Sequence, residues 1–195
     1  MREHRSPFSV CFVVDNSYSV HAERMVENVK GLVFRLLEDS THRGDRVALV
    51  AFKGGLPEAT VALPLTSSLA LALRRLKAVP LSGRTPLADA LSRARRLLRQ
   101  DALKRPNAVP VVVVVTDGQP TVARRPGGDP LADVLAEARE LRRAGIFCAV
   151  ADTSRPGPAA EASCGRALAS TSGGLWLPMS ELAPDVLTGA LAELA

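Results

Sequence analysis

Short apolar runs alternate along this chain with longer segments in which apolar residues recur at helical spacing. Residues 8–14 form an apolar run rich in β-branched and aromatic residues that stops at Asp15, which is typical of a buried strand meeting a polar loop. Residues 109–116 include five consecutive valines, so this strand has no polar face and must be covered on both sides. The other predicted strands are residues 46–53, 58–63, 146–151 and 175–178.

The segments between these strands carry the period of amphipathic helices. The predicted helices are residues 21–41, 68–78, 86–100, 130–143, 159–170 and 182–194. Thr85 is expected to be the N-cap of the helix over 86–100, with Pro86 at its first position.

This order of elements predicts an α/β fold built on an open, doubly wound, mostly parallel six-stranded sheet with helices on both faces. Residues 54–57 suit a tight connection, so the strand over 58–63 is expected to pair antiparallel with the strand over 46–53 as an edge strand. A length of 195 residues fits one domain over residues 8–195, preceded by a tail of residues 1–7.

Composition narrows the possible partners. Lys and Arg total 25 against 20 for Asp and Glu, a mild excess that favours an acidic partner without requiring one. The basic clusters lie on predicted helices, where solvated faces are the usual explanation and an acidic protein partner is the alternative. With only 4% aromatic residues there are few platforms for stacking bases, so nucleic acid is not expected as a partner.

The sequence also carries information about where in the cell the protein is located. The longest apolar stretch, residues 108–115, is too short to cross a bilayer, which takes about 20 residues. The start of the chain lacks the features of a secretory signal, so we expect a cytoplasmic protein. Its three cysteines form no CxxC pair and are expected to be reduced, structural thiols.

Oxygen-bearing side chains gather at the predicted carboxyl ends of two strands. Asp15, Ser17 and Ser19 follow the first strand at spacings of two, so they can converge on one point in an extended loop. Asp117 directly follows the polyvaline strand, and Thr85 lies in the loop before a helix. In doubly wound sheets, ligands bind beyond the carboxyl ends of strands where the strand order reverses.

These five side chains offer the ligands that Mg²⁺ prefers. Hard divalent ions take oxygen ligands, and Mg²⁺ usually has one or two carboxylates together with waters. Two carboxylates and three neutral hydroxyls would at most neutralise the ion, leaving it able to accept an Asp or Glu from a partner protein.

The motifs FVVDNSYS, SGRTPLADAL and VVVVVTDGQP resemble the metal-ion-dependent adhesion site of von Willebrand factor type A domains. Together with LLEDSTHRGDRVALVAFKG, they are most similar to the carboxyl-terminal domain of the magnesium chelatase D subunit. The resemblance implies a Rossmann-like sheet and Mg²⁺, with Mn²⁺ as the alternative, held by Asp15, Ser17, Ser19, Thr85 and Asp117.

For function, the resemblance implies a non-catalytic protein-interaction module within an assembly that contains an AAA-type ATPase. An alternative within that setting is a part in a chelatase complex that inserts Mg²⁺ or Co²⁺ into a tetrapyrrole. A second alternative is a metal-free scaffold. In that case Ser19 and Thr85 serve as helix caps, and Asp117 with the following Gly forms a turn.

The residue at position 17 argues against the function of an Mg²⁺-dependent phosphatase. Asp15 at the end of a first strand also fits the haloacid-dehalogenase type of site, but such enzymes place a second Asp two residues later as an acid-base group. Here that residue is Ser17, which cannot act as the acid-base group. The sequence also lacks the common motifs of serine hydrolases, P-loop NTPases and dinucleotide-binding enzymes.

Overall fold

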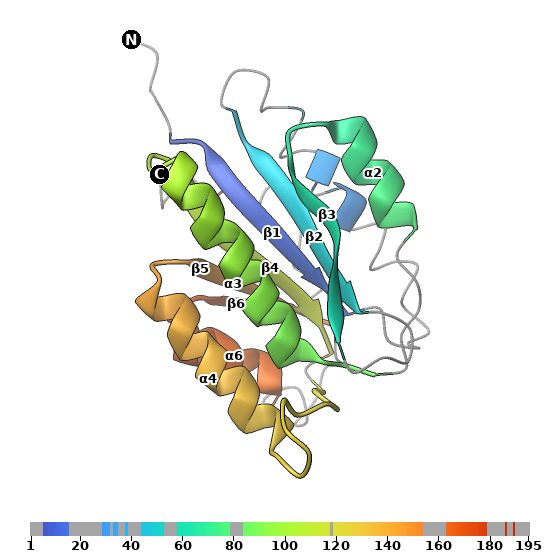
Figure 1. The fold of residues 1–195 in the computed structure, drawn as a ribbon, viewed down its shortest axis with the longest axis vertical. Coiled ribbons are helices and arrows are strands. Elements are labelled where there is room, and N and C mark those ends of the chain that lie inside the picture. Colours follow the sequence, from blue (N-terminus) through green and yellow to red (C-terminus); the bar gives the residue numbers. More distant parts are fainter. Residues whose placement is uncertain are drawn as a thin grey trace.

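The computed structural model describes ten helices and strands that follow the predicted order (Figure 1). It describes residues 6–15, 29–31, 33–34, 38, 44–52, 58–78, 84–117, 119–153, 163–178, 186 and 189. The strands are β1 (Phe8–Val14), β2 (Arg46–Phe52), β3 (Ala59–Thr66), β4 (Val109–Thr116), β5 (Phe147–Asp152) and β6 (Leu175–Pro178). The helices are α2 (Leu69–Lys77), α3 (Leu87–Lys104), α4 (Pro130–Arg143) and α6 (Cys164–Ser172).

The strands form one six-stranded sheet in the order β3-β2-β1-β4-β5-β6. All neighbouring pairs are parallel except β2 and β3, which are antiparallel, so β3 is the antiparallel edge strand that was predicted. The strand order reverses between β1 and β4, whose register pairs Val14 with Val115. The carboxyl ends of β1 and β4 therefore lie side by side at the position where doubly wound sheets bind ligands.

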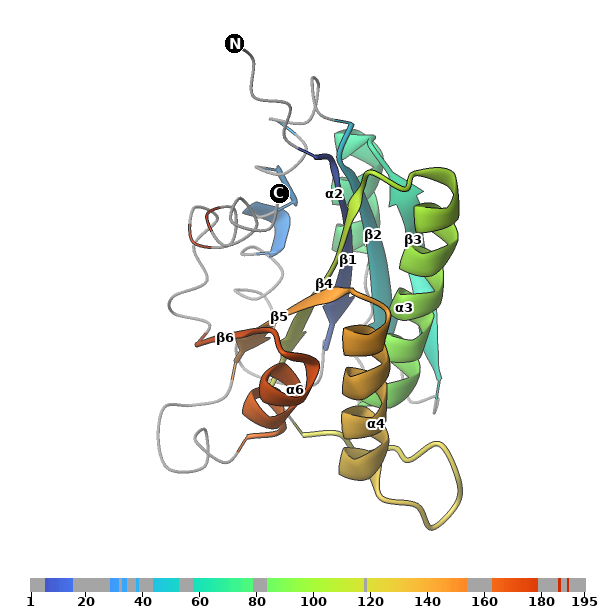
Figure 2. The ribbon, with the colours of Figure 1, turned by 90° about the vertical axis from the view of Figure 1, so that its left-hand side faces the viewer.

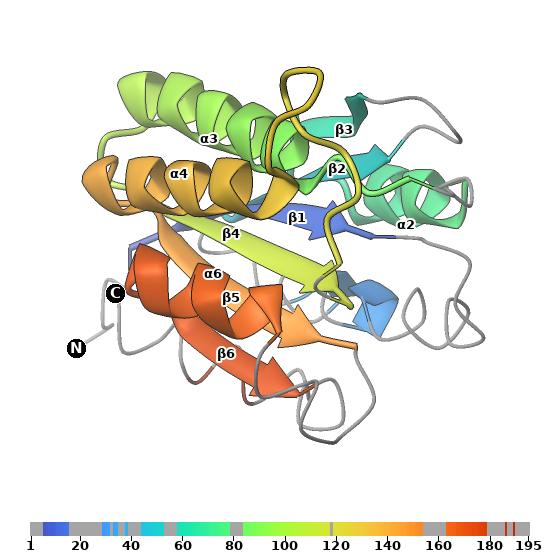
Figure 3. The same ribbon diagram turned by 90° about the horizontal axis from the view of Figure 1, so that it is seen from below.

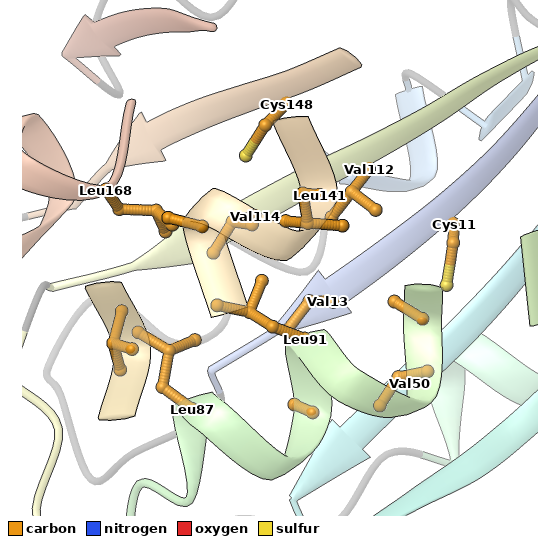
Figure 4. Close-up of a cluster of buried hydrophobic side chains, with 14 of the residues drawn as sticks. Cys11, Val13, Val50, Leu87, Leu91, Val112, Val114, Leu141, Cys148 and Leu168 are labelled. Atoms are coloured by element: carbon orange, nitrogen blue, oxygen red, sulfur yellow. The ribbon is translucent and has the colours of Figure 1, made fainter. Parts of the chain in front are cut away.

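Helices cover both faces of the sheet, as Figures 2 and 3 show. On one face, α3, α4 and α6 pack against side chains such as Cys11, Val13 and Val112 (Figure 4). On the other face, α2 packs against a cluster that includes Val10 and Val113. Consecutive valines of β4 thus enter opposite clusters, which confirms that the polyvaline strand is covered on both sides.

Most predicted elements are confirmed, and the differences lie at their ends. β3 extends through Pro64 to Thr66, whereas the prediction ended at residue 63. An edge strand tolerates proline because its outward N–H is not needed for pairing. α3 continues to Lys104 rather than ending at residue 100, because Asp101 is a buried part of the helix. There its carboxylate accepts a hydrogen bond from the Ser9 hydroxyl, with an oxygen-oxygen distance of 2.6 Å.

Three predicted helices lie wholly or partly outside the described residues. The helix over 21–41 is described only at residues 29–31, 33–34 and 38, all helical, and the helix over 182–194 only at residues 186 and 189, also helical. α6 begins at Cys164, capped by the hydroxyl of Ser163, while residues 159–162 are not described. The tight connection expected over residues 54–57 lies outside the described part as well.

All three cysteines are free and buried, as predicted. Burial raises the pKa of the Cys148 thiol to about 12 and that of Cys164 to about 11, and it raises the pKa of Cys11 still further. These thiols are packing groups, since the reactive form of cysteine is the thiolate.

None of the helices in the described residues has the length and apolar content that a bilayer span requires.

Candidate functional site

Asp15 directly follows β1, one of the two central strands of the sheet. Its backbone N–H donates to the carbonyl oxygen of Val115 at 2.8 Å, which extends the β1–β4 ladder by one residue. Its side chain is buried, and the hydroxyl of Thr116 donates to its Oδ2 at 2.9 Å. This hydrogen bond orients the Asp15 carboxylate at the end of the sheet.

Asp117 lies at the same edge, one residue beyond the end of β4. Its Oδ1 accepts a hydrogen bond from the backbone N–H of Gln119 at 3.1 Å, and its side chain is only half-buried. This is an Asx turn, the local structure that makes Asp common after strands. The two predicted carboxylates therefore follow the ends of adjacent parallel strands, as the sequence interpretation expected.

Thr85 enters this edge from the segment before α3. Its backbone N–H donates to the hydroxyl of Thr121 at 2.9 Å, and its carbonyl oxygen accepts from the Thr121 N–H at 3.2 Å. This reciprocal pair ties the residue before α3 to the segment that follows β4 and Asp117. Figure 3 shows that segment running from the tip of β4 past the start of α3 to α4.

The prediction that Thr85 caps α3 is wrong. Pro86 is the N-cap, its carbonyl oxygen accepts from the N–H of Ala90, and no side chain caps this helix. Only 3% of Thr85 is exposed, yet within the described part of the chain its hydroxyl forms no hydrogen bond. Within that part of the chain the Thr85 hydroxyl is a buried polar group with no hydrogen bond, a condition that costs free energy in a folded protein.

The other two predicted ligands cannot be placed. Ser17 and Ser19 lie outside the described residues, so the structure locates three of the five expected oxygen donors. Among the residues that it describes, no three His, Cys, Asp or Glu side chains gather in a way that could hold a metal ion. A site made of two carboxylates and several hydroxyls, which suits Mg²⁺ better than zinc, would not form such a cluster.

Residues that the sequence interpretation did not select hold the segment after β4 in place. Glu137 of α4 is buried and accepts hydrogen bonds from Arg95 of α3 at 2.9 Å and from Arg124 at 2.5 Å. Arg124 also donates to the carbonyl oxygen of Ala88 in the first turn of α3. The bond from Arg95 to Glu137 raises the pKa of the guanidinium, which stays charged.

Two residues that support the site, Glu137 and Thr116, could have been recognised from the sequence. Glu137 lies three residues after Val134 and one before Ala138, on the buried face of α4, where a charged residue requires a partner. Thr116 is the polar residue that ends the polyvaline run. Thr121 and Arg124 had no such signal, because their partners are distant in the sequence.

Solved structures share this fold over nearly the whole chain. BatB from Bacteroides thetaiotaomicron is 17% identical with a TM-score of 0.69, and the match covers 96% of this chain and 98% of that one. The manganese-loaded TRAP protein of Plasmodium vivax is 17% identical with a TM-score of 0.62, covering 92% of this chain and 72% of that one.

The sequence relatives differ in length: one is about as long as this chain, and the others are much longer. The chain is 30% identical to the uncharacterised protein MJ0910 of Methanocaldococcus jannaschii, over 84% of this chain and 91% of that protein. It is 38% identical to the uncharacterised protein Rv2850c of Mycobacterium tuberculosis, over 78% of this chain and 23% of that protein. It is 37% identical to the magnesium-chelatase 60 kDa subunit of Cereibacter sphaeroides, over 75% of this chain and 26% of that subunit.

The chain thus spans about a quarter of the length of the two larger relatives and nearly all of the smaller one. The model of the von Willebrand factor type A domain matches residues 9–174, which include both described carboxylates and Thr85. By this match and by the topology of its sheet, the chain belongs to the von Willebrand factor type A domain family.

Proposed function

We propose that this chain is a metal-dependent protein-interaction module that binds Mg²⁺ through Asp15, Ser17, Ser19, Thr85 and Asp117. In this proposal the bound ion takes an Asp or Glu side chain from a partner protein. Mn²⁺, which also accepts carboxylate and hydroxyl oxygens, is the alternative metal.

The observation that carries the proposal is the buried hydroxyl of Thr85, which forms no hydrogen bond within the described residues. Thr85 is bonded through its backbone to the segment that follows Asp117. A metal ion at this position would give the hydroxyl a partner that the described residues do not provide.

The protein's own residues supply charge balance and orientation. The side chains of Asp15 and Asp117 together match the charge of one divalent cation, and the hydroxyls add ligand oxygens without adding charge. The Thr116 hydroxyl occupies one lone pair of Asp15 Oδ2 and so restricts how that carboxylate can turn. A neutralised ion of this kind supplies a Lewis-acidic position for an incoming carboxylate.

We further propose that the module works within an assembly containing an AAA-type ATPase and has no catalytic activity of its own. The observation that favours a chelatase-like setting is the identity of 37% with a magnesium-chelatase 60 kDa subunit. A part in inserting Mg²⁺ or Co²⁺ into a tetrapyrrole is therefore the second candidate function.

The test is a thermal-unfolding titration of the protein with MgCl₂, with MnCl₂ and with EDTA. A ligand that binds only the folded state stabilises it by about 2.7 kcal/mol when its concentration is 100 times the dissociation constant. We expect millimolar Mg²⁺ to raise the melting temperature of the wild type and to leave Asp117→Asn unchanged. Glu140→Gln, which removes a carboxylate in the last turn of α4 that pairs with Arg143, is the matched control and should respond like the wild type.

Two results would contradict the proposal. If neither metal changes the melting temperature of the wild type, the metal-free scaffold becomes the better description. If the protein hydrolyses p-nitrophenyl phosphate with Mg²⁺ and Asp15→Ala abolishes the turnover, the site is that of a phosphatase.

A further inference from the structure

The outward side of α3 carries a second surface that the proposed metal site does not use. Its residues, which we call the α3 outer surface, are Arg96, Arg99, Gln100 and Leu103. They recur at helical spacing on the carboxyl-terminal half of the helix and line a shallow hollow of about 260 Å³.

The arginines of α3 fall into two groups. Arg93 forms an ion pair with Asp89 of the same helix, and Arg95 forms one with Glu137 of α4. Arg96 and Arg99 are exposed and have no carboxylate partner anywhere in the described residues. The first group stabilises the fold, so the second is available for a ligand.

Leu103 gives this surface an apolar anchor. Its exposed fraction is 87%, about twice that of any other exposed large apolar residue that the structure describes, the next being Phe34 and Val186 at 42%. Single exposed apolar residues are common on protein surfaces. Leu103, however, borders a hollow together with Arg96 and Arg99, which have no carboxylate partner among the described residues, and arginine is enriched at the centre of protein interfaces.

We infer that the α3 outer surface binds an acidic segment of a partner protein that carries one apolar side chain. Carboxylates of that segment pair with the guanidinium groups of Arg96 and Arg99, and its apolar side chain packs on Leu103 and on the arginine stems. A nucleic acid is the less suitable occupant because the hollow has no aromatic side chain on which a base could stack.

This surface is separate from the proposed metal site. Arg96 lies nine residues beyond Leu87, the first residue of α3, and Leu103 lies sixteen residues beyond it. With a rise of 1.5 Å per residue, the surface therefore extends from about 14 Å to about 24 Å along the helix from that end. Binding here requires no metal ion, so the inference goes beyond the proposed function and can be tested in EDTA.

The experiment measures binding of a short fluorescein-labelled peptide of Glu and Ala with one central Leu, by fluorescence anisotropy in low salt with EDTA. We expect the wild type to bind it and Arg96→Glu/Arg99→Glu to bind at least tenfold more weakly. Leu103→Ala, or replacing the peptide's Leu by Ala, should weaken binding about threefold or more. These side chains are exposed, so the variants should retain their fold.

The matched control is Arg74→Glu/Arg75→Glu on α2, which makes the same change in charge at two exposed arginines. Helix α2 covers the other face of the sheet, so this double substitution should alter binding less than twofold. An equal loss in this control would overturn the proposal in favour of unspecific attraction, and so would failure of the wild type to bind. Tighter binding of an oligo-dT probe with the same dependence on Arg96 and Arg99 would overturn it in favour of nucleic acid.

Discussion

The Thr85 hydroxyl shows how one residue can meet a local rule and yet serve another purpose. A Thr just before Pro at the start of a helical pattern is a good candidate for an N-cap. In the structure the helix begins one residue later, and Pro86 occupies the cap position. The hydroxyl of Thr85 is then released from capping while remaining buried.

Replacing the Thr85 hydroxyl tests whether it is a metal ligand or only a structural group. Thr85→Val keeps the shape of the side chain and removes an oxygen that bonds to nothing within the described residues. We expect its stability in EDTA to equal or slightly exceed that of the wild type, because a buried polar group is lost. The apparent affinity of the variant for Mg²⁺, measured from the shift in melting temperature, should be at least tenfold lower than that of the wild type.

Thr85→Ser is the matched control, because it retains the oxygen and should retain the response to Mg²⁺. A Thr85→Val protein that responds to Mg²⁺ like the wild type would show that this hydroxyl is not a ligand.

At the scale of elements, the segment between β4 and α4 is held by contacts at both ends. Thr121 pairs with Thr85 before α3, and the Arg124 backbone N–H donates to the Asp133 carboxylate of α4 at 2.7 Å. Arg124 and Arg95 meet on Glu137. Through these bonds, α3 and α4 position the residues that follow Asp117.

Glu137→Leu should destabilise the protein by about 3–5 kcal/mol, because it leaves partly buried arginines without their carboxylate. Glu140→Gln, three residues later on the same helix, removes an exposed ion pair with Arg143 and should cost less than about 1 kcal/mol. Urea unfolding monitored by circular dichroism measures both values. Similar costs for the two variants would contradict the structural role of Glu137.

At the scale of the whole molecule, stability should depend on pH through thiols buried in the core. Cys148 has an ordinary pKa of 9.0 when exposed and about 12 in the folded protein, because burial disfavours the thiolate. Above pH 9 the unfolded chain therefore holds fewer protons than the folded one. The contribution of this thiol to stability is complete below pH 9 and is lost as pH rises toward 12.

We expect the free energy of unfolding of the wild type to fall more steeply than that of Cys148→Ala between pH 10 and 11. The difference in slope should be about 1.4 kcal/mol per pH unit for one thiol. Chemical unfolding of both proteins across this range, under reducing conditions, measures it. Parallel slopes would show that the Cys148 thiol ionises as readily in the folded protein as in the unfolded one.

Much of the architecture could be read from local patterns, and the errors have local causes. The polyvaline run required cover on both faces, and β4 lies between β1 and β5 with a layer of helices on each side. The end of α3 was missed because Asp101 looks like a residue that ends a buried face. Only its distant contacts with Ser9 and Arg46 explain why it lies inside the fold.

For the candidate site, too, some features could be recognised from the sequence and others could not. The residue types at Asp15 and Asp117 and their positions after strands could be recognised without coordinates, because strand ends follow from hydrophobic periodicity. Ser17 and Ser19 belong to the same motif, and their positions remain a prediction. The contacts of Thr116 with Asp15, of Thr121 with Thr85 and of Arg124 with Glu137 could not be recognised in this way.

Local patterns were enough to locate the strands and helices, to show that β4 is buried on both faces, and to find the oxygen donors that follow the strands. These properties depend on neighbouring residues in the chain. Only the three-dimensional structure shows that β1 lies beside β4. It also shows that, among the described residues, the buried Thr85 hydroxyl has no hydrogen-bond partner and Arg96 and Arg99 have no carboxylate partner. Those properties depend on side chains brought together from distant parts of the chain, and the energy of such contacts leaves no local pattern to read.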